Sequence, residues 1–143
     1  MQTAMIQGLE GRTLFASPHF VEGPTFSDNG TTLTATGSVA GLGNEDVTVA
    51  VAAKGTATIV CRNPAGKVAP GQTRNVNVSG QQTLTDVKNG RVNFSVTTVA
   101  PTAPADACPN RKWTATVTNV NFSEASVTVS QGGEVVLTQT QSL

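Results

Sequence analysis

Apolar and polar residues alternate along most of the chain beyond residue 30. In the stretch "DVTVAVAA", for example, Val47, Val49 and Val51 fall on one side and Thr48 falls on the other. A period of two is typical of a strand that buries one face, and no stretch beyond residue 20 shows the 3.6-residue period of a helix. The alternating segments are 31–41, 46–53, 56–61, 74–80, 91–99, 112–122, 125–131 and 134–140. The pattern therefore predicts an all-β protein.

Glycine-containing pairs lie between several of these segments. An Asn-Gly pair supplies the two residues with positive φ that a type I′ hairpin turn needs. The pairs that lie directly before predicted strands are Asn29-Gly30, Asn89-Gly90 and Gly132-Gly133. We expect the last pair to form the hairpin that joins the two final strands. Short strands separated by such turns predict an immunoglobulin-like antiparallel β-sandwich of about 7–8 strands.

Three stretches contain prolines: 17–26, 62–72 and 100–109. Proline has no N–H group to donate to a strand ladder, so we expect these stretches to be loops at sheet edges or ends. The strands and loops together predict a single domain over residues 17–143. Residues 1–16 then form a separate N-terminal arm or the remnant of a leader.

Composition narrows the classes of function. Nine basic residues balance nine acidic ones, and only 13% of all residues are charged. A neutral chain argues against a nucleic-acid or anionic-membrane surface, and no apolar run approaches the ~20 residues that span a bilayer. The chain has no Tyr, one His and no recognisable catalytic motif. We therefore predict no enzymatic activity, no catalytic residue, no metal, no cofactor, no nucleic-acid partner and no membrane insertion.

Cys61 and Cys108 are the two cysteines of the chain. A structural zinc site needs four ligands, and a catalytic thiol needs a base, for which His19 is the sole histidine. We favour a disulfide over free buried thiols, because each cysteine borders a predicted strand near an end of the sandwich. Such a bridge would join the two layers and would remove roughly 4 kcal/mol of unfolded-chain entropy. It would place maturation in an oxidising compartment.

Other candidate sites have simpler explanations. Asn44, Glu45 and Asp46 lie between glycines, where oxygen ligands could hold calcium, but adjacent acidic residues in a hairpin loop are more often only solvated. His19 is expected to be a packed or surface residue. Trp113, five residues after Cys108, is expected to lie in the core, as a Trp beside a bridge does in many sandwiches.

The first sixteen residues do not form a normal signal peptide, because they lack a basic start and a continuous apolar run. They could instead be a donor arm that adds a strand to the open sheet edge of a neighbouring copy. The apolar residues that would dock are Met5, Ile6, Leu9, Leu14 and Phe15.

Five short motifs occur in a fixed order: "SPHFV" (17–21), "AGLGN" (40–44), "CRNPAG" (61–66), "KNG" (88–90) and "ACP" (107–109). This order resembles a group of small secreted bacterial proteins that have a cleaved leader. The resemblance implies an exported single β domain with one bridge, and it implies no particular activity. The chain departs from the group at "NPAG", where a second Gly is expected, and in residues 1–16, which do not look like the group's leaders.

These observations predict a secreted, extracellular and non-enzymatic β-sandwich with a structural or adhesive role at the cell surface or in the matrix. Its partner would be a cell-surface component or a second copy of itself. The first alternative is a fibre subunit assembled by donor-strand addition. The second is a protease inhibitor or small hydrolase, in which residues 62–72 would present Arg62 or Lys67.

Overall fold

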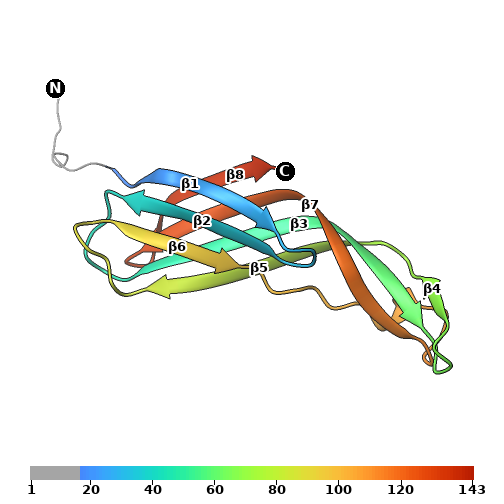
Figure 1. The fold of residues 1–143 in the computed structure, drawn as a ribbon. Coiled ribbons are helices and arrows are strands. Elements are labelled where there is room, and N and C mark those ends of the chain that lie inside the picture. The colour runs from blue at the N-terminus through green and yellow to red at the C-terminus, as the bar shows by residue number, and fades with distance from the viewer. Residues whose placement is uncertain (1–16) are drawn as a thin grey trace.

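The structure, a computed structural model, describes residues 17–143 as eight strands and one short 3-10 helix, so the predicted all-β class is confirmed (Figure 1). The strands form two antiparallel sheets that pack face to face. No helix of these residues is long and apolar enough to cross a membrane. The elements are β1 (His19–Asp28), β2 (Leu33–Ala40), β3 (Val47–Arg62), β4 (Val68–Pro70), β5 (Arg74–Leu84), β6 (Val92–Thr97), η2 (Ala105–Ala107), β7 (Thr114–Gln131) and β8 (Glu134–Ser142).

The small sheet has the strand order β1-β2-β6, and the large sheet is built around β3. On one side, β3 pairs with β5 over residues 47–57 and with β4 over residues 60–62. On its other side β3 pairs with β7, and β7 pairs with β8 at the sheet edge. The central strand of the large sheet is therefore shared by the sandwich and by a region beyond it.

The core lies between the two sheets and consists mainly of β-branched residues. Along β3 every second residue from Val47 to Cys61 is buried, as expected for a strand with one covered face. Phe94 of β6 packs edge to face against Phe20 of β1, with ring centroids 6.3 Å apart. The central core cluster comprises Ala35, Val39, Leu42, Val47, Val49, Val51, Val92, Phe94, Val96, Val127 and Val129.

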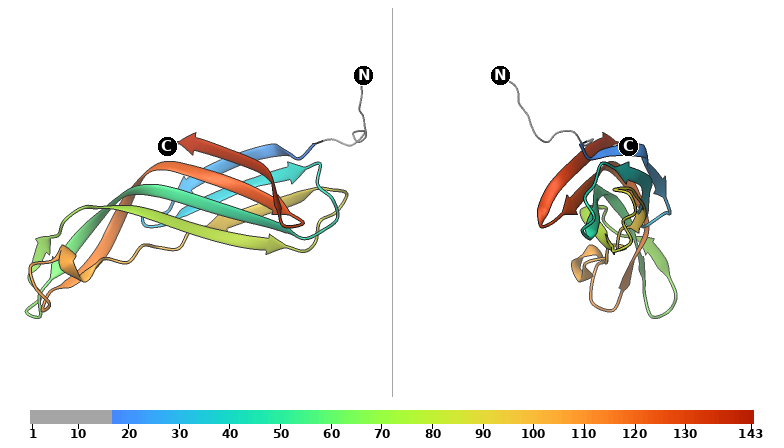
Figure 2. Two further views of the ribbon diagram at one scale, coloured as in Figure 1. Left: turned by 180° about the vertical axis from the view of Figure 1, so that it is seen from behind. Right: turned by 90° about the vertical axis from the view of Figure 1, so that its left-hand side faces the viewer.

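The two longest strands continue past the small sheet. β3 has 16 residues and β7 has 18, which at roughly 3.3 Å per residue corresponds to about 50–60 Å. Figures 1 and 2 show that these strands leave the sandwich together and carry β4 and η2 at their far end. We call this region, residues 58–74 and 105–118, the distal arm.

Strand boundaries differ from the sequence prediction at several positions. Residues 46–53 and 56–61 belong to one strand, because Gly55 continues the ladder across a register shift after Lys54. Residues 112–122 and 125–131 are likewise joined in β7.

The proline-containing stretch 17–26 is not a loop but contains most of β1, an edge strand with two register shifts. Its predicted place at a sheet edge is confirmed.

The predicted type I′ turns are correct at two of three positions. Asn89 and Gly90 have φ values of 55° and 72°, and Gly132 and Gly133 have values of 64° and 82°. At the β1–β2 turn only Gly30 has a positive φ. That turn has four residues between Asp28 and Leu33, and the Asp28 carboxylate accepts a hydrogen bond from the Gly30 N–H at 2.7 Å.

Candidate binding surface

The outward face of the large sheet carries mainly neutral polar side chains. Residues directly opposite each other on neighbouring antiparallel strands point to the same side, so the register defines rows that run across the sheet. One such row is Ser79, Ala52, Ser126 and Thr140. The next row is Asn77, Lys54, Glu124 and Ser142. These rows place hydroxyl and amide groups on four adjacent strands, β5, β3, β7 and β8.

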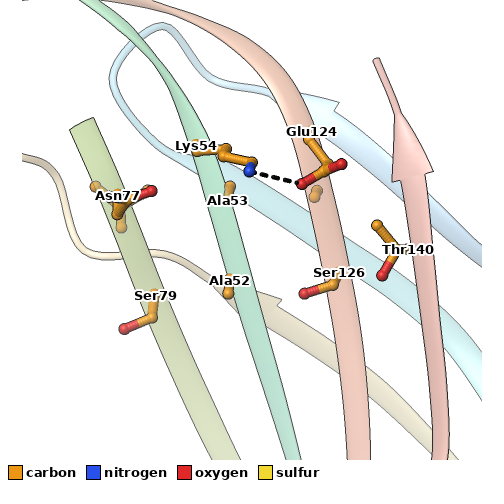
Figure 3. Close-up of a pocket in the computed structure, with 10 residues that line it drawn as sticks. Ala52, Ala53, Lys54, Asn77, Ser79, Glu124, Ser126 and Thr140 are labelled. Carbon is orange, nitrogen blue, oxygen red and sulfur yellow. Dashed lines mark ion pairs between the residues drawn. The ribbon is translucent and has the colours of Figure 1, made fainter. Parts of the chain in front are cut away.

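A shallow hollow of about 340 Å³ lies on this face, with Ala52 on its floor (Figure 3). β3, the central strand, presents the small side chain of Ala52 here, opposite the short side chains of Ser79 and Ser126. Ser79 lines the hollow from β5, and Ser126 and Thr140 line it from β7 and β8. The hollow thus combines an apolar floor with hydroxyl-bearing walls.

One ion pair crosses the same surface. Lys54 Nζ lies 3.2 Å from a Glu124 carboxylate oxygen, and the two side chains are 59% and 41% exposed. An exposed pair of this kind contributes little stability, about 0–1 kcal/mol. Its main effect here is to leave the surface without net charge while providing a donor and an acceptor at the edge of the hollow.

The chemistry available on this face is hydrogen bonding. Within residues 17–143 no three His, Cys, Asp or Glu side chains come together as a metal site. The sole histidine, His19, lies exposed at the start of β1 in the other sheet, where its Nδ1 donates to the Ser17 carbonyl at 2.7 Å. The serine hydroxyls of the hollow therefore have no imidazole beside them to act as a base.

The predicted disulfide between Cys61 and Cys108 is present, with Cα atoms 5.8 Å apart. Its position differs from the prediction, because it does not join the two layers of the sandwich. It ties the end of β3 to the segment before β7, within the distal arm. Cys61 is fully buried, and a Cβ at Gly71 would lie only 3.0 Å from its sulfur. The bridge thus anchors the start of loop 62–72 to the segment before β7.

Loop 62–72 is a closed hairpin. The Asn63 N–H donates to the Lys67 carbonyl at 3.0 Å, and the Lys67 N–H donates to the Asn63 side-chain oxygen at 2.8 Å. Short strand β4 then pairs back onto β3. Arg62 and Lys67 are both exposed beside this turn. Because the loop is a closed hairpin and not an extended segment, it lends no support to the protease-inhibitor alternative, which stays a prediction.

Trp113 is not in the core, contrary to the sequence prediction. It is half-buried in the bend just before β7, and its backbone N–H donates to the Asn110 carbonyl at 3.2 Å. The reason is its place in the distal arm, where the small sheet does not extend to cover it.

The loop with the conceivable calcium ligands, residues 41–46, is held by Gln131 at the end of β7. The side-chain oxygen of Gln131 accepts from the Gly43 N–H at 2.8 Å. Its amide nitrogen donates to the carbonyls of Gly43 at 2.7 Å and Glu45 at 2.8 Å. Two backbone oxygens of the loop are thereby engaged by an amide. Asn44, Glu45 and Asp46 are all exposed.

Replacing Gln131 by Ala should lower the free energy of unfolding by about 1–2 kcal/mol, because three hydrogen bonds that fasten the loop are lost. Gln131→Glu should cost at least as much, since a carboxylate would face two carbonyl oxygens. Urea unfolding followed by tryptophan fluorescence measures both. Gln139→Ala, at an exposed position of β8, is the matched control and should change stability by less than about 0.5 kcal/mol. Equal losses at positions 131 and 139 would contradict the assignment.

The proposed docking residues of the N-terminal arm, Met5, Ile6, Leu9, Leu14 and Phe15, lie outside the described residues. The donor-strand interpretation therefore stays a prediction.

Comparison with known proteins gives little further guidance. No protein-family model matches the chain, and no curated protein matches it. Among solved structures, the chain is similar to β-glucosidase 3B from Thermotoga neapolitana, solved in complex with α-D-glucose. The match has a TM-score of 0.29 and 16% identity, and it covers 88% of this chain but 16% of that chain. A similarity this low carries no argument about activity.

Proposed function

We propose that this protein is a secreted, non-enzymatic β-sandwich module with an adhesive or structural role at the cell surface or in the extracellular matrix. The observation that carries the proposal is the outward face of the large sheet, with its hollow over Ala52 and its hydroxyl and amide walls. A disulfide fits maturation in an oxidising compartment. His19 lies in the other sheet, so no imidazole stands beside the hydroxyls of the hollow, and this favours binding over catalysis.

The surface chemistry indicates the kind of component that would be bound. Sugar hydroxyls are both donors and acceptors, and so are the groups of Ser79, Ser126 and Thr140 that surround the hollow. Lys54 and Glu124 add charge-assisted hydrogen bonds without favouring a charged ligand. A neutral, hydroxyl-rich glycan of the cell surface is therefore the partner that fits this face.

Filling the hollow should weaken such binding. In Ala52→Gln the longer side chain occupies the floor, and we expect the dissociation constant for glycans bound by the wild type to rise at least about tenfold, equivalent to about 1.4 kcal/mol. A glycan array followed by calorimetry on the hits provides the measurement. Ser95→Gln, at an exposed position on the small sheet, is the control and should bind as the wild type does.

Two results would overturn the proposal. One is glycan binding that Ala52→Gln leaves unchanged, which would move the contact to another face. The other is reproducible turnover of any glycan, which would make the protein an enzyme.

A further inference from the structure

The zero net charge of the chain conceals a separation of charge along the molecule. β3 begins directly after Asp46 and ends at Arg62. β7 runs in the opposite direction, from just after Lys112 to three residues before Glu134. Because the two strands are antiparallel partners over their whole length, acidic residues meet at one end of the pair and basic residues meet at the other.

The basic end is the tip of the distal arm. Arg62, Lys67, Arg111 and Lys112 are exposed there, and none of them forms an ion pair within the described residues 17–143. Arg62 lies opposite Thr114 in the β3–β7 ladder, so the turns that carry these residues are neighbours, and Figure 2 shows both at the same end. The acidic residue of the arm, Asp106, is engaged by Arg74 at 3.1 Å.

The acidic end lies at the opposite pole, beyond the sandwich. Glu45 and Asp46 are exposed in the loop that Gln131 fastens, and Glu134 is exposed where β8 starts. The Glu45 carboxylate reaches the β7–β8 turn, since a Cβ at Gly132 would lie 3.3 Å from its oxygen. The neighbouring β5–β6 turn adds Asp86, paired with Lys88 at 3.9 Å, and the exposed Arg91.

The two poles act as separate charges. A 16-residue strand spans about 50 Å, whereas charges in physiological salt are screened over about 8 Å. Neither pole therefore neutralises the other within one molecule, and each remains available to a neighbouring molecule.

We propose that the basic arm tip of one copy docks on the acidic pole of the next copy, so that the protein assembles head to tail. The favoured occupant is a second copy because the complementary charges belong to this same chain. A contact between two different surfaces repeats from copy to copy and produces open filaments or closed rings. This inference rests on the structural role proposed above and adds to it the partner and the contact.

A charge-exchange experiment tests the contact. The tip-reversed variant carries Arg62→Glu, Arg111→Glu and Lys112→Glu, and the pole-reversed variant carries Glu45→Lys, Asp46→Lys and Glu134→Lys. Wild-type protein should form species larger than the monomer in analytical ultracentrifugation at low salt and lose them at high salt. Each variant alone should associate at least about tenfold more weakly, because like charges meet.

The decisive sample is the equimolar mixture of the two variants. In an alternating assembly the acidic tip of the tip-reversed copy meets the basic pole of the pole-reversed copy, and the basic tip of that copy meets the acidic pole of the next. Every contact then joins opposite charges, so larger species should return at about the wild-type concentration. A control with Thr25→Lys and Ser95→Lys, both exposed on the small sheet, adds charge away from the poles and should associate as the wild type does. Circular dichroism and urea midpoints verify that all variants fold.

The proposal is overturned if the wild type stays monomeric at low salt, or if the mixture remains as dissociated as its components. It is also overturned if the wild-type tip instead binds anionic vesicles, heparin or DNA without affecting self-association. Glycan binding by the Ala52 surface is measured on monomers at high salt, so that either proposal can fail without the other.

Discussion

Replacing Cys61 and Cys108 together by Ala should lower the free energy of unfolding by about 4 kcal/mol. The bridge closes a loop between residues 47 positions apart, and without it the unfolded chain regains the corresponding conformational entropy. This is a large share of the ~5–15 kcal/mol that stabilises a typical domain. Urea unfolding of the double variant against the oxidised wild type gives the value directly.

The same variant should open the distal arm before the sandwich. Few backbone hydrogen bonds hold residues 98–113, and the arm has one sheet layer, so trypsin should cleave after Arg111 and Lys112 earlier than at any site in the sandwich. Mass spectrometry of a digestion series identifies the order. Arg74→Gln, which removes the partly exposed pair with Asp106 and a hydrogen bond to the Gln72 side chain, is the control and should cost less than about 1 kcal/mol. Unchanged stability and unchanged cleavage in the double-Ala variant would refute this account of the bridge.

Replacing Gly55 by Ala should lower the free energy of unfolding by about 3 kcal/mol. Gly55 lies in the middle of β3, at a register shift where it faces Phe122. A Cβ there would collide with the Asn121 carbonyl oxygen and would lie 2.8 Å from the Phe122 Cα. Both are backbone atoms of β7 that cannot rotate away, so the long ladder must distort.

Gly43→Ala is the matched control for this substitution. A Cβ at Gly43 would lie 3.4 Å from the Gln131 side chain, which is near ordinary contact and can adjust. We expect a change below about 0.5 kcal/mol in the same chemical denaturation series. Similar losses at positions 43 and 55 would contradict this explanation, because Gly→Ala by itself lowers the entropy of the unfolded chain and does not destabilise the fold.

The sequence predicted the fold class because alternation and turn residues are local signals. The predicted strand boundary at Gly55 was wrong for a related reason. A glycine inside an alternating run looks like a break in the strand. Only the pairing with the partner strand reveals that it is a bulge in a continuous ladder. Strand β1 was missed because its proline suggested a loop, whereas an edge strand tolerates Pro24.

The candidate surfaces were less predictable because they depend on pairing between distant segments. The disulfide was found because Cys61 has a single potential partner. No local sequence pattern shows that Ala52 lies in a row with Ser126 and Thr140 across the sheet. Nor does one show that Arg62 lies opposite Thr114. A neutral composition argues against anionic partners only as a sum over the chain, and that sum carries no information on where the strand register places the charged residues.

The pairing of β3 and β7 has a mechanical consequence. The two strands stay paired from the sandwich into the arm, across register shifts after Lys54 and after Thr58, without an intervening linker. A pull on the tip acts parallel to both strands, and their hydrogen bonds are then loaded in shear, where many must yield together. Tension applied at one extremity would thus be transmitted directly to the valine-rich interior.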